Sequence, residues 1–587
     1  MSAIASTEHG KPLGWVSKKM MCDEAGIKFI HGVEIYLTES LEPKVRDNYH
    51  TVLLAKNWQG VLELNELVTK SGMEDHFYYV NRLSFDEFLR ISDNIVTTSA
   101  CLASPLNKLP DDHPYYDRLA RKYSWLEIQP HSHPDQVAYN KRLFELSKRI
   151  GTPLIAGTDT HSSSKYKAEC RSILTAAKNK NYGDEDSFDL SWKSYDELAD
   201  AFRMQGALPE EVFLEAIENT NRMADSIEPF ELDKSIKYPL LHGSKERDSL
   251  VFRETVDQML EEKLSSGVIP AEQEQAFRDA IREEMRVFEK LEMSGFMLSM
   301  SELIRWCKKN GMAIGTARGS VGGSRVAYVT DIIDLNPETW HTVFSRFCNE
   351  DRKEIGDIDI DCVESDRPAI FKHIIDRFGA DKTARVAAYG TLKAKGVIDE
   401  IYRAKMYEWN LAHGYKKDEK PRENPYHYDA AAKIKDMLPP DMDERMKAAR
   451  KNGTPFSEVP GTEELFRASP ETMRFFDGMW DIKVSQSVHP AGMIISPVSL
   501  SENYGTFQKD GETCLMLDME EAHEVGVAKY DFLVLKTVQV IRDACELIGV
   551  SYPKSSEINW NDEAVWESMI RSPAGLFQFE GKQNCSR

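Results

Sequence analysis

The chain has 587 residues and a formal net charge of −22. Hydrophobic residues make up 41% and charged residues 29%, which is ordinary for a globular protein, and the length predicts about four domains of roughly 150 residues. No apolar run reaches the ~18 residues that span a bilayer, and the N-terminus lacks the pattern of a signal peptide. The nine cysteines contain no C-x-x-C pair, which argues against a disulfide framework or a zinc finger and predicts reduced thiols in the cytoplasm.

The periodicity changes along the chain. Residues 1–160 alternate short apolar runs such as HTVLLA and TPLIAG with helical segments, which predicts an α/β layered or barrel unit. A charged helical region follows at 245–292, and residues 395–482 are expected to be mostly helical and polar. Apolar runs return after residue 483, in AGMIISP and VAKYDFLVL.

One segment departs from the acidic average. Residues 382–422 hold ten Lys or Arg against five Asp or Glu, with tyrosines and a tryptophan interleaved. Such a segment is suited to follow a phosphate backbone, although a solvated helical face is the more ordinary interpretation of this segment alone.

A glycine-rich motif lies at residues 312–333, MAIGTARGSVGGSRVAYVTDII. MAIGT is typical of a strand and SRVAYVTDII of a helix, so the glycines between them form a turn before a helix N-terminus. Backbone N–H groups at such a place favour an anion, and Arg318 is placed to add charge-assisted bonds to a phosphate. A purely structural turn explains the pattern equally well.

The stretch GDIDIDC, residues 356–362, raises the question of what offsets the repulsion among its aspartates. In a strand, Asp357, Asp359 and Asp361 share one face and the isoleucines share the other. A further carboxylate, Asp531, is isolated in the apolar strand VAKYDFLVL. Two Mg²⁺ ions held by these groups would repay the cost, and a phosphate cradle upstream of clustered carboxylates indicates phosphoryl transfer to or from a nucleotide.

These motifs resemble those of the C family of replicative DNA polymerases, the bacterial DNA polymerase III alpha subunits. Eleven blocks match in the family's order: STEHG (6–10), GVEIY (32–36), HTVLLAKN (50–57), TDTH (158–161), GTARGSVGGSRVAY (315–328), FSRFCNEDR (344–352), GDIDIDC (356–362), AAYGTLKAKGVI (387–398), SVHPAGMIISP (487–497), AKYDFLVLKTV (528–538) and GLFQFEG (575–581).

The resemblance implies roles for individual residues. Asp357, Asp359 and Asp531 are the implied catalytic ligands of two Mg²⁺ ions, and Asp361 is an implied supporting group. The implied nucleotide-binding residues are Arg318, Gly319, Ser320, Arg346, Arg352, Lys395, His489 and Lys529. Gly356 stands where the family usually has proline, and Val534 where it has glycine; neither is an implied ligand.

The N-terminal region resembles the polymerase-and-histidinol-phosphatase (PHP) domain, a distorted β/α barrel whose first strand, with its H-x-H motif, has no counterpart here. Some members use this domain as a 3′–5′ exonuclease. The metal positions that remain, for Zn²⁺ or Mn²⁺, are Glu8 (aspartate in the family), His9, Glu34, His50, Cys101, Asp159 and His161.

The implied fold is multidomain α/β and α+β, with a nucleotidyltransferase-like palm, a helical thumb and the start of helical fingers. The expected parts are a PHP domain at 1–235, palm at 236–390, thumb at 391–482, palm at 483–538 and fingers at 539–587. Relative to the family the chain is expected to be truncated at both ends, as a fragment, a split or phage-encoded version, or a mis-called reading frame.

The function expected from the resemblance is template-dependent DNA synthesis in replication. The implied partners are primer–template DNA, deoxynucleoside triphosphates and, through a missing C-terminal part, a sliding clamp and other replisome subunits. No membrane partner is expected. Two alternatives stay open: a metal-dependent phosphoesterase or 3′–5′ exonuclease acting through the N-terminal domain, and a catalytically weak DNA-binding fragment.

Overall fold

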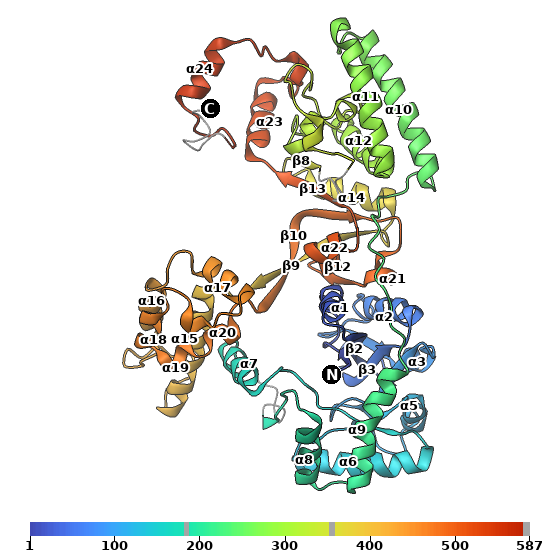
Figure 1. Ribbon diagram of the computed structural model, residues 1–587, viewed down its shortest axis with the longest axis vertical. Helices are drawn as coiled ribbons and strands as arrows, with labels where there is room; N and C mark the ends of the chain where they lie inside the picture. The colour runs from blue at the N-terminus through green and yellow to red at the C-terminus, as the bar shows by residue number, and fades with distance from the viewer. Residues whose placement is uncertain (181–186, 351–357, 579–587) are drawn as a thin grey trace. The chain divides into compact units, whose positions relative to one another are not determined.

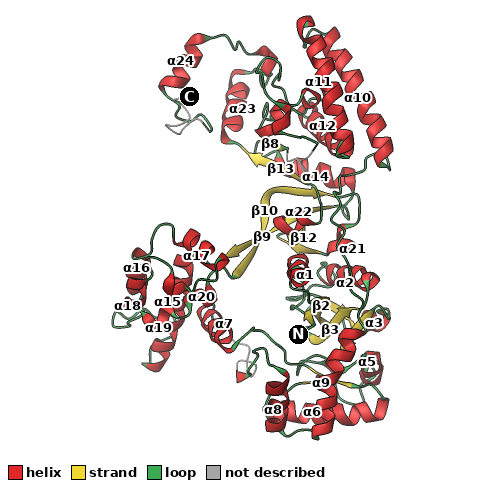
Figure 2. Cartoon of the chain, in the orientation of Figure 1, coloured by secondary structure: helices red, strands yellow, loops and turns green. Residues whose placement is uncertain are grey.

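A computed structural model describes residues 1–180, 187–350 and 358–578. It is a mixed α/β structure with several sheets, which confirms the predicted fold class at this level (Figures 1 and 2). Contacts divide the chain into two compact units: residues 1–230 with 388–487, and residues 231–387 with 488–587. The division into five parts stays a prediction. Within the described ranges no helix is long and apolar enough to cross a membrane, and the eight cysteines there are free thiols.

The first unit begins with a five-stranded sheet in the order β1-β2-β3-β5, with β4 paired to β2. Its strands are β1 (Ala3–Ser6), β2 (Lys28–Thr38), β3 (Tyr49–Ala55), β4 (Arg82–Ser84) and β5 (Ile95–Thr98), and a second sheet pairs β6 (Leu126–Ile128) with β7 (Leu154–Ala156). The helices among and after them are α1 (Trp15–Glu24), α2 (Trp58–Ser71), α3 (Phe85–Arg90), α4 (Pro105–Lys108), α5 (Tyr116–Lys122), α6 (Pro134–Ile150), α7 (Lys165–Ala177), α8 (Tyr195–Gln205) and α9 (Glu210–Asp225).

The same unit contains the helical segment that the sequence predicts at 395–482. Its helices are α15 (Ala394–Ala412), α16 (Tyr428–Asp436), α17 (Met442–Lys451), α18 (Glu463–Ala468), α19 (Pro470–Met473) and α20 (Phe476–Met479). They enclose a core of their own, which includes Val397, Ile401 and Phe476, and α7 packs against α15. The aromatic residues of the basic segment also pack on one another, since the ring of Trp409 stacks on those of His413 and Tyr415.

The second unit is built on a six-stranded mixed sheet in the order β11-β12-β9-β10-β13-β8. The strands are β8 (Asp359–Cys362), β9 (Thr383–Thr391), β10 (Lys483–Ile495), β11 (Thr506–Lys509), β12 (Glu512–Asp518) and β13 (Lys529–Val534). The helices are α10 (Lys245–Ser265), α11 (Glu274–Lys290), α12 (Ser294–Lys309), α13 (Arg325–Val329), α14 (Arg367–Phe378), α21 (Leu500–Tyr504), α22 (Met519–Glu524), α23 (Lys536–Ile548) and α24 (Glu563–Arg571).

One core joins helices α10, α11 and α12 to this sheet. Phe252, Phe288 and Phe296 from the helices belong to the same buried cluster as Ile360 of β8 and Tyr530 of β13. The hydroxyl of Tyr530 is 2.6 Å from that of Ser299 on α12, so this buried polar group has a partner. Because side chains alternate along a strand, burying Ile360 and Tyr530 turns their neighbours Asp359, Asp361 and Asp531 to the other face.

The glycine-rich motif differs from its prediction. Its first part is not a strand, because only Ile314 pairs, in an isolated bridge with Cys362. Gly319–Gly323 forms a 3₁₀ turn, and the helix after it, α13, has only five residues. The left-handed conformation of Asp331 (φ 63°) follows soon after the helix ends, where the sequence pattern alone predicted four more helical residues.

The turn before β13 is held by a neighbouring segment of the same unit. Lys237 donates its backbone N–H to Gly526 O (2.7 Å) and its ammonium to Val525 O (2.9 Å). Gly526 has φ +73°, and a Cβ there would lie 2.1 Å from Ser235 O. Glycine is therefore required at position 526 both for its left-handed backbone and because no space is left for a side chain.

We expect Gly526→Ala to destabilise the fold by about 2–5 kcal/mol, because it adds a backbone clash to the ~1 kcal/mol cost of a left-handed alanine. The matched control is Gly549→Ala, at φ +70° with nothing within 4 Å of the added methyl, which should carry only the smaller cost. Urea unfolding of both variants gives the comparison. Equal losses at the two positions would contradict the close packing at Gly526.

Candidate functional site

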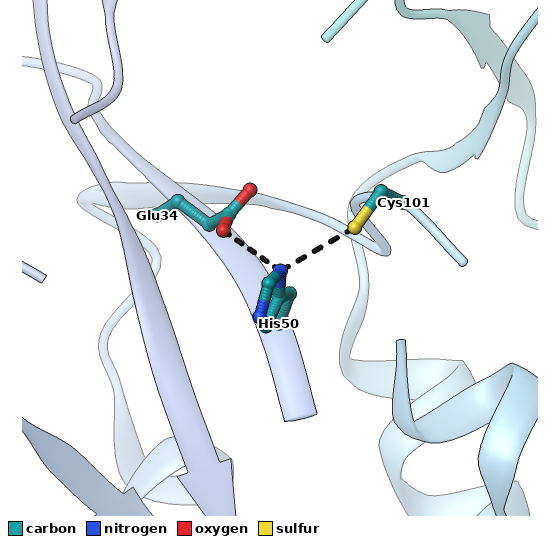
Figure 3. A group of neighbouring side chains, drawn as sticks. All are labelled: Glu34, His50 and Cys101. Atoms are coloured by element: carbon teal, nitrogen blue, oxygen red, sulfur yellow. Dashed lines mark hydrogen bonds and ion pairs between the residues drawn. The ribbon is translucent and has the colours of Figure 1, made fainter. Parts of the chain in front are cut away.

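The first unit gathers potential metal ligands at one end of its sheet. His50 Nδ1 lies 2.8 Å from Glu34 Oε1 and 3.4 Å from Cys101 Sγ (Figure 3). The three ligand atoms all lie within 4.8 Å of one another, a spacing that fits one ion. A thiolate, an imidazole and a carboxylate together are a donor set that suits Zn²⁺.

Charges around this cluster act on its protons. Burial alone would raise the pKa of Glu34, but His50, His9 and His161 beside it lower it overall. Burial raises the pKa of the Cys101 thiol above its usual range, and the negative charges of Glu34 and Asp159 raise it further. A cation bound among these groups would have to displace the proton of Cys101.

Four other predicted metal positions divide into two groups. His9 Nε2 lies 3.5 Å from Glu34 Oε1, and the His9 ring is 5.3 Å from that of His161, whose Nδ1 is 3.6 Å from Asp159 Oδ1. These three therefore lie with the cluster. Glu8 does not: its carboxylate accepts from Ser6 Oγ (2.8 Å) and pairs closely with Lys18.

In the second unit, two of the predicted catalytic aspartates lie side by side. Strands β8 and β13 pair in parallel with Asp531 opposite Asp359 and Leu533 opposite Asp361. Paired residues of neighbouring strands face the same side of a sheet, so all three carboxylates share one face. Asp357 lies outside the described residues.

The three carboxylates differ in burial and partners. The Asp359 side chain is 35% exposed, whereas those of Asp531 and Asp361 are 15% and 8% exposed. Asp531 Oδ2 is 2.7 Å from Lys529 Nζ, while Asp531 Oδ1 is buried and accepts no hydrogen bond from the described residues. A buried carboxylate oxygen without a partner is costly, and a divalent cation between Asp359 and Asp531 would satisfy it.

His489 stands on the next strand. Gly492 of β10 pairs with Asp531, and its backbone N–H donates to His489 Nδ1 at 3.1 Å. Burial lowers the pKa of His489, and the Lys529 charge lowers it further against the opposing effect of Asp531. His489 is therefore a neutral imidazole near neutral pH, with Nδ1 as acceptor.

Arg385, on β9, is a positioning residue that the motifs do not predict. Its buried guanidinium donates to the carbonyl oxygens of His489 (2.8 Å), Pro490 (2.9 Å) and Gly492 (3.0 Å), and it also pairs with Glu512. It thereby holds the segment that carries His489 against the sheet. The available signal was a single arginine inside the apolar run TARVAAY.

The glycine-rich motif contributes a cation to the carboxylate face. Arg318 Nη1 donates to Asp361 Oδ1 at 2.6 Å, and Arg318 Nε lies 3.6 Å from Asp359 Oδ2. The other side of the guanidinium faces the ring of Phe577, 5.3 Å away.

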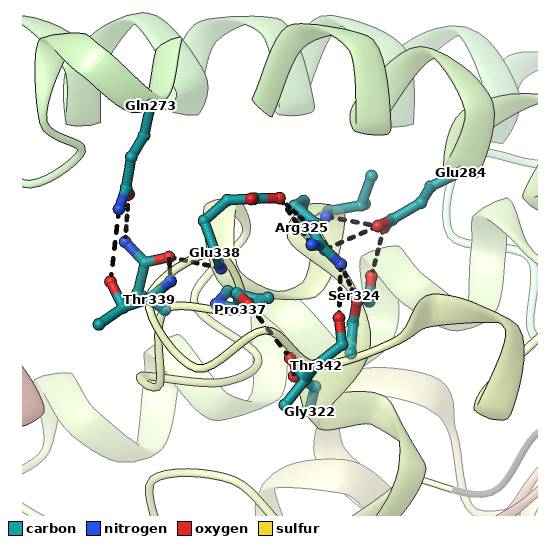
Figure 4. Close-up of polar contacts among 12 residues, drawn as sticks. Gln273, Glu284, Gly322, Ser324, Arg325, Pro337, Glu338, Thr339 and Thr342 are labelled. Atoms are coloured by element: carbon teal, nitrogen blue, oxygen red, sulfur yellow. Dashed lines mark hydrogen bonds and ion pairs between the residues drawn. The ribbon is translucent and has the colours of Figure 1, made fainter. Parts of the chain in front are cut away.

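The N-terminus of the short helix α13 is already filled by a carboxyl group (Figure 4). The buried Glu284 carboxylate of α11 accepts from the backbone N–H groups of Arg325 (2.9 Å) and Val326 (3.0 Å) and from Ser324 Oγ (2.7 Å). Burial raises the pKa of Glu284 to about 7, although these donors oppose the rise. The donors at this helix N-terminus are thus taken by a carboxyl group from another helix, whereas the phosphate contacts of Arg318, Gly319 and Ser320 in the same motif stay a prediction.

The other predicted nucleotide-binding residues are placed as follows. Gly319 (φ +70°) and Ser320 lie in the 3₁₀ turn that follows Arg318, and Arg346 is exposed at the end of a second 3₁₀ turn, Phe344–Arg346. Lys395 is exposed at the start of α15, in the first unit. Arg352 lies outside the described residues.

Comparisons with known proteins agree with the sequence motifs. Residues 251–534 match the family model described as the bacterial DNA polymerase III alpha NTPase domain, and residues 1–131 match the PHP domain. Each relative named below is described as "DNA polymerase III subunit alpha". The chain is 28% identical to the Borreliella burgdorferi protein over 610 residues, 26% to the Campylobacter jejuni protein over 639 and 25% to the Aquifex aeolicus protein over 622.

These alignments cover 99% of this chain but 50%, 50% and 53% of the three relatives, so the chain spans about half the length of the curated relatives it matches. The PHP match lies in the first unit with Glu34, His50 and Cys101, whereas the NTPase-domain match includes Asp359 and Asp531 of the second unit and also residues 388–487 of the first. The chain is therefore a homologue of the bacterial DNA polymerase III alpha subunits, the family whose motifs its sequence carries.

Proposed function

We propose that the chain is the catalytic part of a DNA-directed DNA polymerase that adds deoxynucleotides to a primer 3′ end. The observation that carries this proposal is the register of β8 and β13, which sets Asp359 opposite Asp531 and leaves one buried Asp531 oxygen without a partner among the described residues. Two neighbouring carboxylates are what a metal-assisted phosphoryl transfer needs from the protein. The finer fold is assigned with it: a distorted barrel at 1–235, palm at 236–390 and 483–538, thumb at 391–482 and the start of fingers at 539–587.

In the proposed reaction, the primer 3′-oxygen forms a bond to the α-phosphorus as the bond to the bridging oxygen breaks and pyrophosphate leaves. Divalent cations supply Lewis acidity, lowering the pKa of the attacking hydroxyl and neutralising the leaving phosphates. The chain's own part is to hold Asp359 and Asp531 rigidly on paired strands. Lys529 and His489 border the same face, where Lys529 supplies a fixed positive charge and the neutral His489 a hydrogen-bonding edge.

We assign nucleotide contacts to Gly319, Ser320 and Arg346, next to Arg318 in the second unit. The positive-φ Gly319 leaves the backbone of the turn open, since nothing lies within 4 Å of where its Cβ would be. DNA is assigned to the basic segment 382–422. Deoxynucleoside triphosphates and primer–template DNA are therefore the proposed ligands.

The decisive test is Asp531→Asn, with Asp359→Asn as its pair. Each removes one negative ligand while preserving shape, so we expect Mg²⁺-dependent primer extension to fall by at least about 100-fold, as when an electrostatic group of the transition state is lost. Primer extension is measured with the 587-residue chain joined to the rest of the polymerase, and the substitution is made within the 587 residues. The control is Asp366→Asn, which neutralises a carboxylate that follows β8 in sequence and pairs with Arg542. Wild-type rates in either test variant would contradict the assignment.

Exposed apolar side chains concentrate near the end of the described chain. Eleven of the 28 large exposed hydrophobic residues fall between Val534 and Phe577, among them Leu547 (87% exposed), Ile548 (72%) and Ile570 (70%). α23 buries only Val538. A surface of this kind usually contacts other polypeptide.

Because the chain spans about half of its relatives, we propose that polypeptide equivalent to the part of them outside these alignments covers this surface. We expect the 587-residue chain alone to bind DNA weakly and to extend primers slowly or not at all, and we expect that further polypeptide, joined or added separately, to restore extension. Leu547→Lys should weaken the restoration, whereas Leu250→Lys, at an exposed leucine of α10, should not. Processive synthesis by the chain alone would contradict this proposal.

A second candidate activity is a metal-dependent phosphoesterase or 3′–5′ exonuclease in the first unit. The supporting observation is the compact Glu34, His50 and Cys101 cluster, with His9, Asp159 and His161 beside it. These side chains would hold Zn²⁺ or Mn²⁺, which activates water for attack on a phosphodiester.

His50→Ala and Cys101→Ser should each remove about one equivalent of bound Zn²⁺ from the chain, because each takes away one of three ligands of the same ion. Glu8→Gln is the control and should leave the zinc content unchanged, since Glu8 is paired with Lys18. Metal content after dialysis is measured by mass spectrometry. Loss of zinc in Glu8→Gln, or none in His50→Ala, would contradict this placement of the ion.

A further inference from the structure

The third aspartate of the GDIDIDC motif has an unexpected position. The Asp361 side chain is 8% exposed, and besides its strand pairing Asp361 makes two hydrogen bonds to the glycine-rich motif. Its backbone oxygen accepts from the N–H of Gly315 (2.8 Å), and its carboxylate binds Arg318 Nη1 (2.6 Å). A Cβ at Gly315 would lie 2.7 Å from the Asp361 Cβ, so the two segments are in tight contact.

This anchoring sets the position of the Arg318 charge. With Nη1 bound to Asp361, the guanidinium Nε stands 3.6 Å from Asp359 Oδ2. That distance is a charge contact without a good hydrogen bond, so Asp359 holds Arg318 less firmly than Asp361 does. The Arg318 side chain is 24% exposed, and its guanidinium also lies over the ring of Phe577.

The charges on this sheet face form two matched sets. Arg318 lies against Asp359 and Asp361, and Lys529 lies against Asp531. Among the described residues of this face, two cations thus lie against three carboxylates that would otherwise repel one another on adjacent strands. A divalent cation bound by Asp359 and Asp531 would meet Arg318 as a competing like charge.

We propose that Arg318 is a built-in counter-cation that occupies the Asp359 side of the site until a divalent cation binds, and that Asp361 positions Arg318 and does not ligate the metal. The proposal rests on the proposed function, because it takes Asp359 and Asp531 as the metal ligands. It gives Asp361 a role that differs from theirs although it shares their strand face. Binding of the divalent cation frees the guanidinium from Asp359 for an anion such as a triphosphate.

The test is Mn²⁺ binding to the full chain without DNA or nucleotide, followed by electron paramagnetic resonance. The Mn²⁺ bound at this site is taken as the Mn²⁺ that the wild type binds and Asp531→Asn does not. Arg318→Met keeps about the length of the side chain but removes its charge. In this variant, Mn²⁺ at this site should bind about tenfold more tightly, a change of about 1.4 kcal/mol. Arg318→Lys retains a charge and should stay within about threefold of the wild type.

The matched control is Arg377→Met, which removes an arginine paired with Glu302 in the same unit and should leave Mn²⁺ affinity unchanged. Because removing the counter-cation restores repulsion among the carboxylates, Mn²⁺ should also raise the melting temperature of Arg318→Met more than that of the wild type. Arg318→Gln replaces the methionine variant if the latter does not fold.

Asp361→Asn distinguishes the role of Asp361 in holding Arg318 from a role as a metal ligand. In the Arg318→Met background the anchor has nothing to hold, so Asp361→Asn should change Mn²⁺ affinity by less than about threefold. A loss of more than about tenfold in that background would make Asp361 a ligand and overturn the proposal. Unchanged affinity in Arg318→Met would overturn it as well, while leaving the proposed function intact. If Asp531→Asn binds as much Mn²⁺ as the wild type, the proposal for Arg318 and the proposed function both fail.

Discussion

The parallel pairing of β8 with β13 is the interaction on which the second unit depends. It places Asp359 opposite Asp531 on one face and buries Ile360 and Tyr530 on the other. Neither half of this arrangement is stable alone, because the apolar face needs α12 against it and the acidic face needs cations. The same two strands therefore supply both the buried core face and the acidic face. A shift of one residue in register would turn the aspartates toward the core and the apolar residues toward the site.

The surrounding charges follow from that constraint. Lys529 sits two residues before Asp531 on the same strand face, while Arg318 arrives from another segment through Asp361. Arg385 serves the same face indirectly, since it secures three carbonyl oxygens of the His489 segment. Each of these cations is mostly buried, where an ion pair is retained only when its geometry and further hydrogen bonds offset the cost of desolvation.

Local periodicity predicted much of this site. The alternation of Asp and Ile indicated one acidic and one apolar face, and the lone charge in VAKYDFLVL indicated a paired carboxylate. The sequence could not predict that Asp531 would lie opposite Asp359, because register between distant strands depends on the whole sheet. Nor could it predict that a carboxyl group of α11 would fill the N-terminus of α13. The partner there is Glu284, which in sequence is one acidic residue among several on a charged helix.

The N-terminal cluster shows the same limit at the scale of neighbouring residues. Glu8 and His9 are consecutive family positions, and the resemblance treats both as metal ligands. Consecutive side chains of an extended segment point to opposite sides, so His9 faces Glu34 while Glu8 faces Ser6 and Lys18. A sequence motif thus identifies a residue type but does not say which way its side chain points. The cation that pairs with Glu8 is the ammonium group of Lys18. The number of metal ions this unit can hold is decided by which residues turn inward, and that depends on strand geometry more than on how many ligand types the sequence retains.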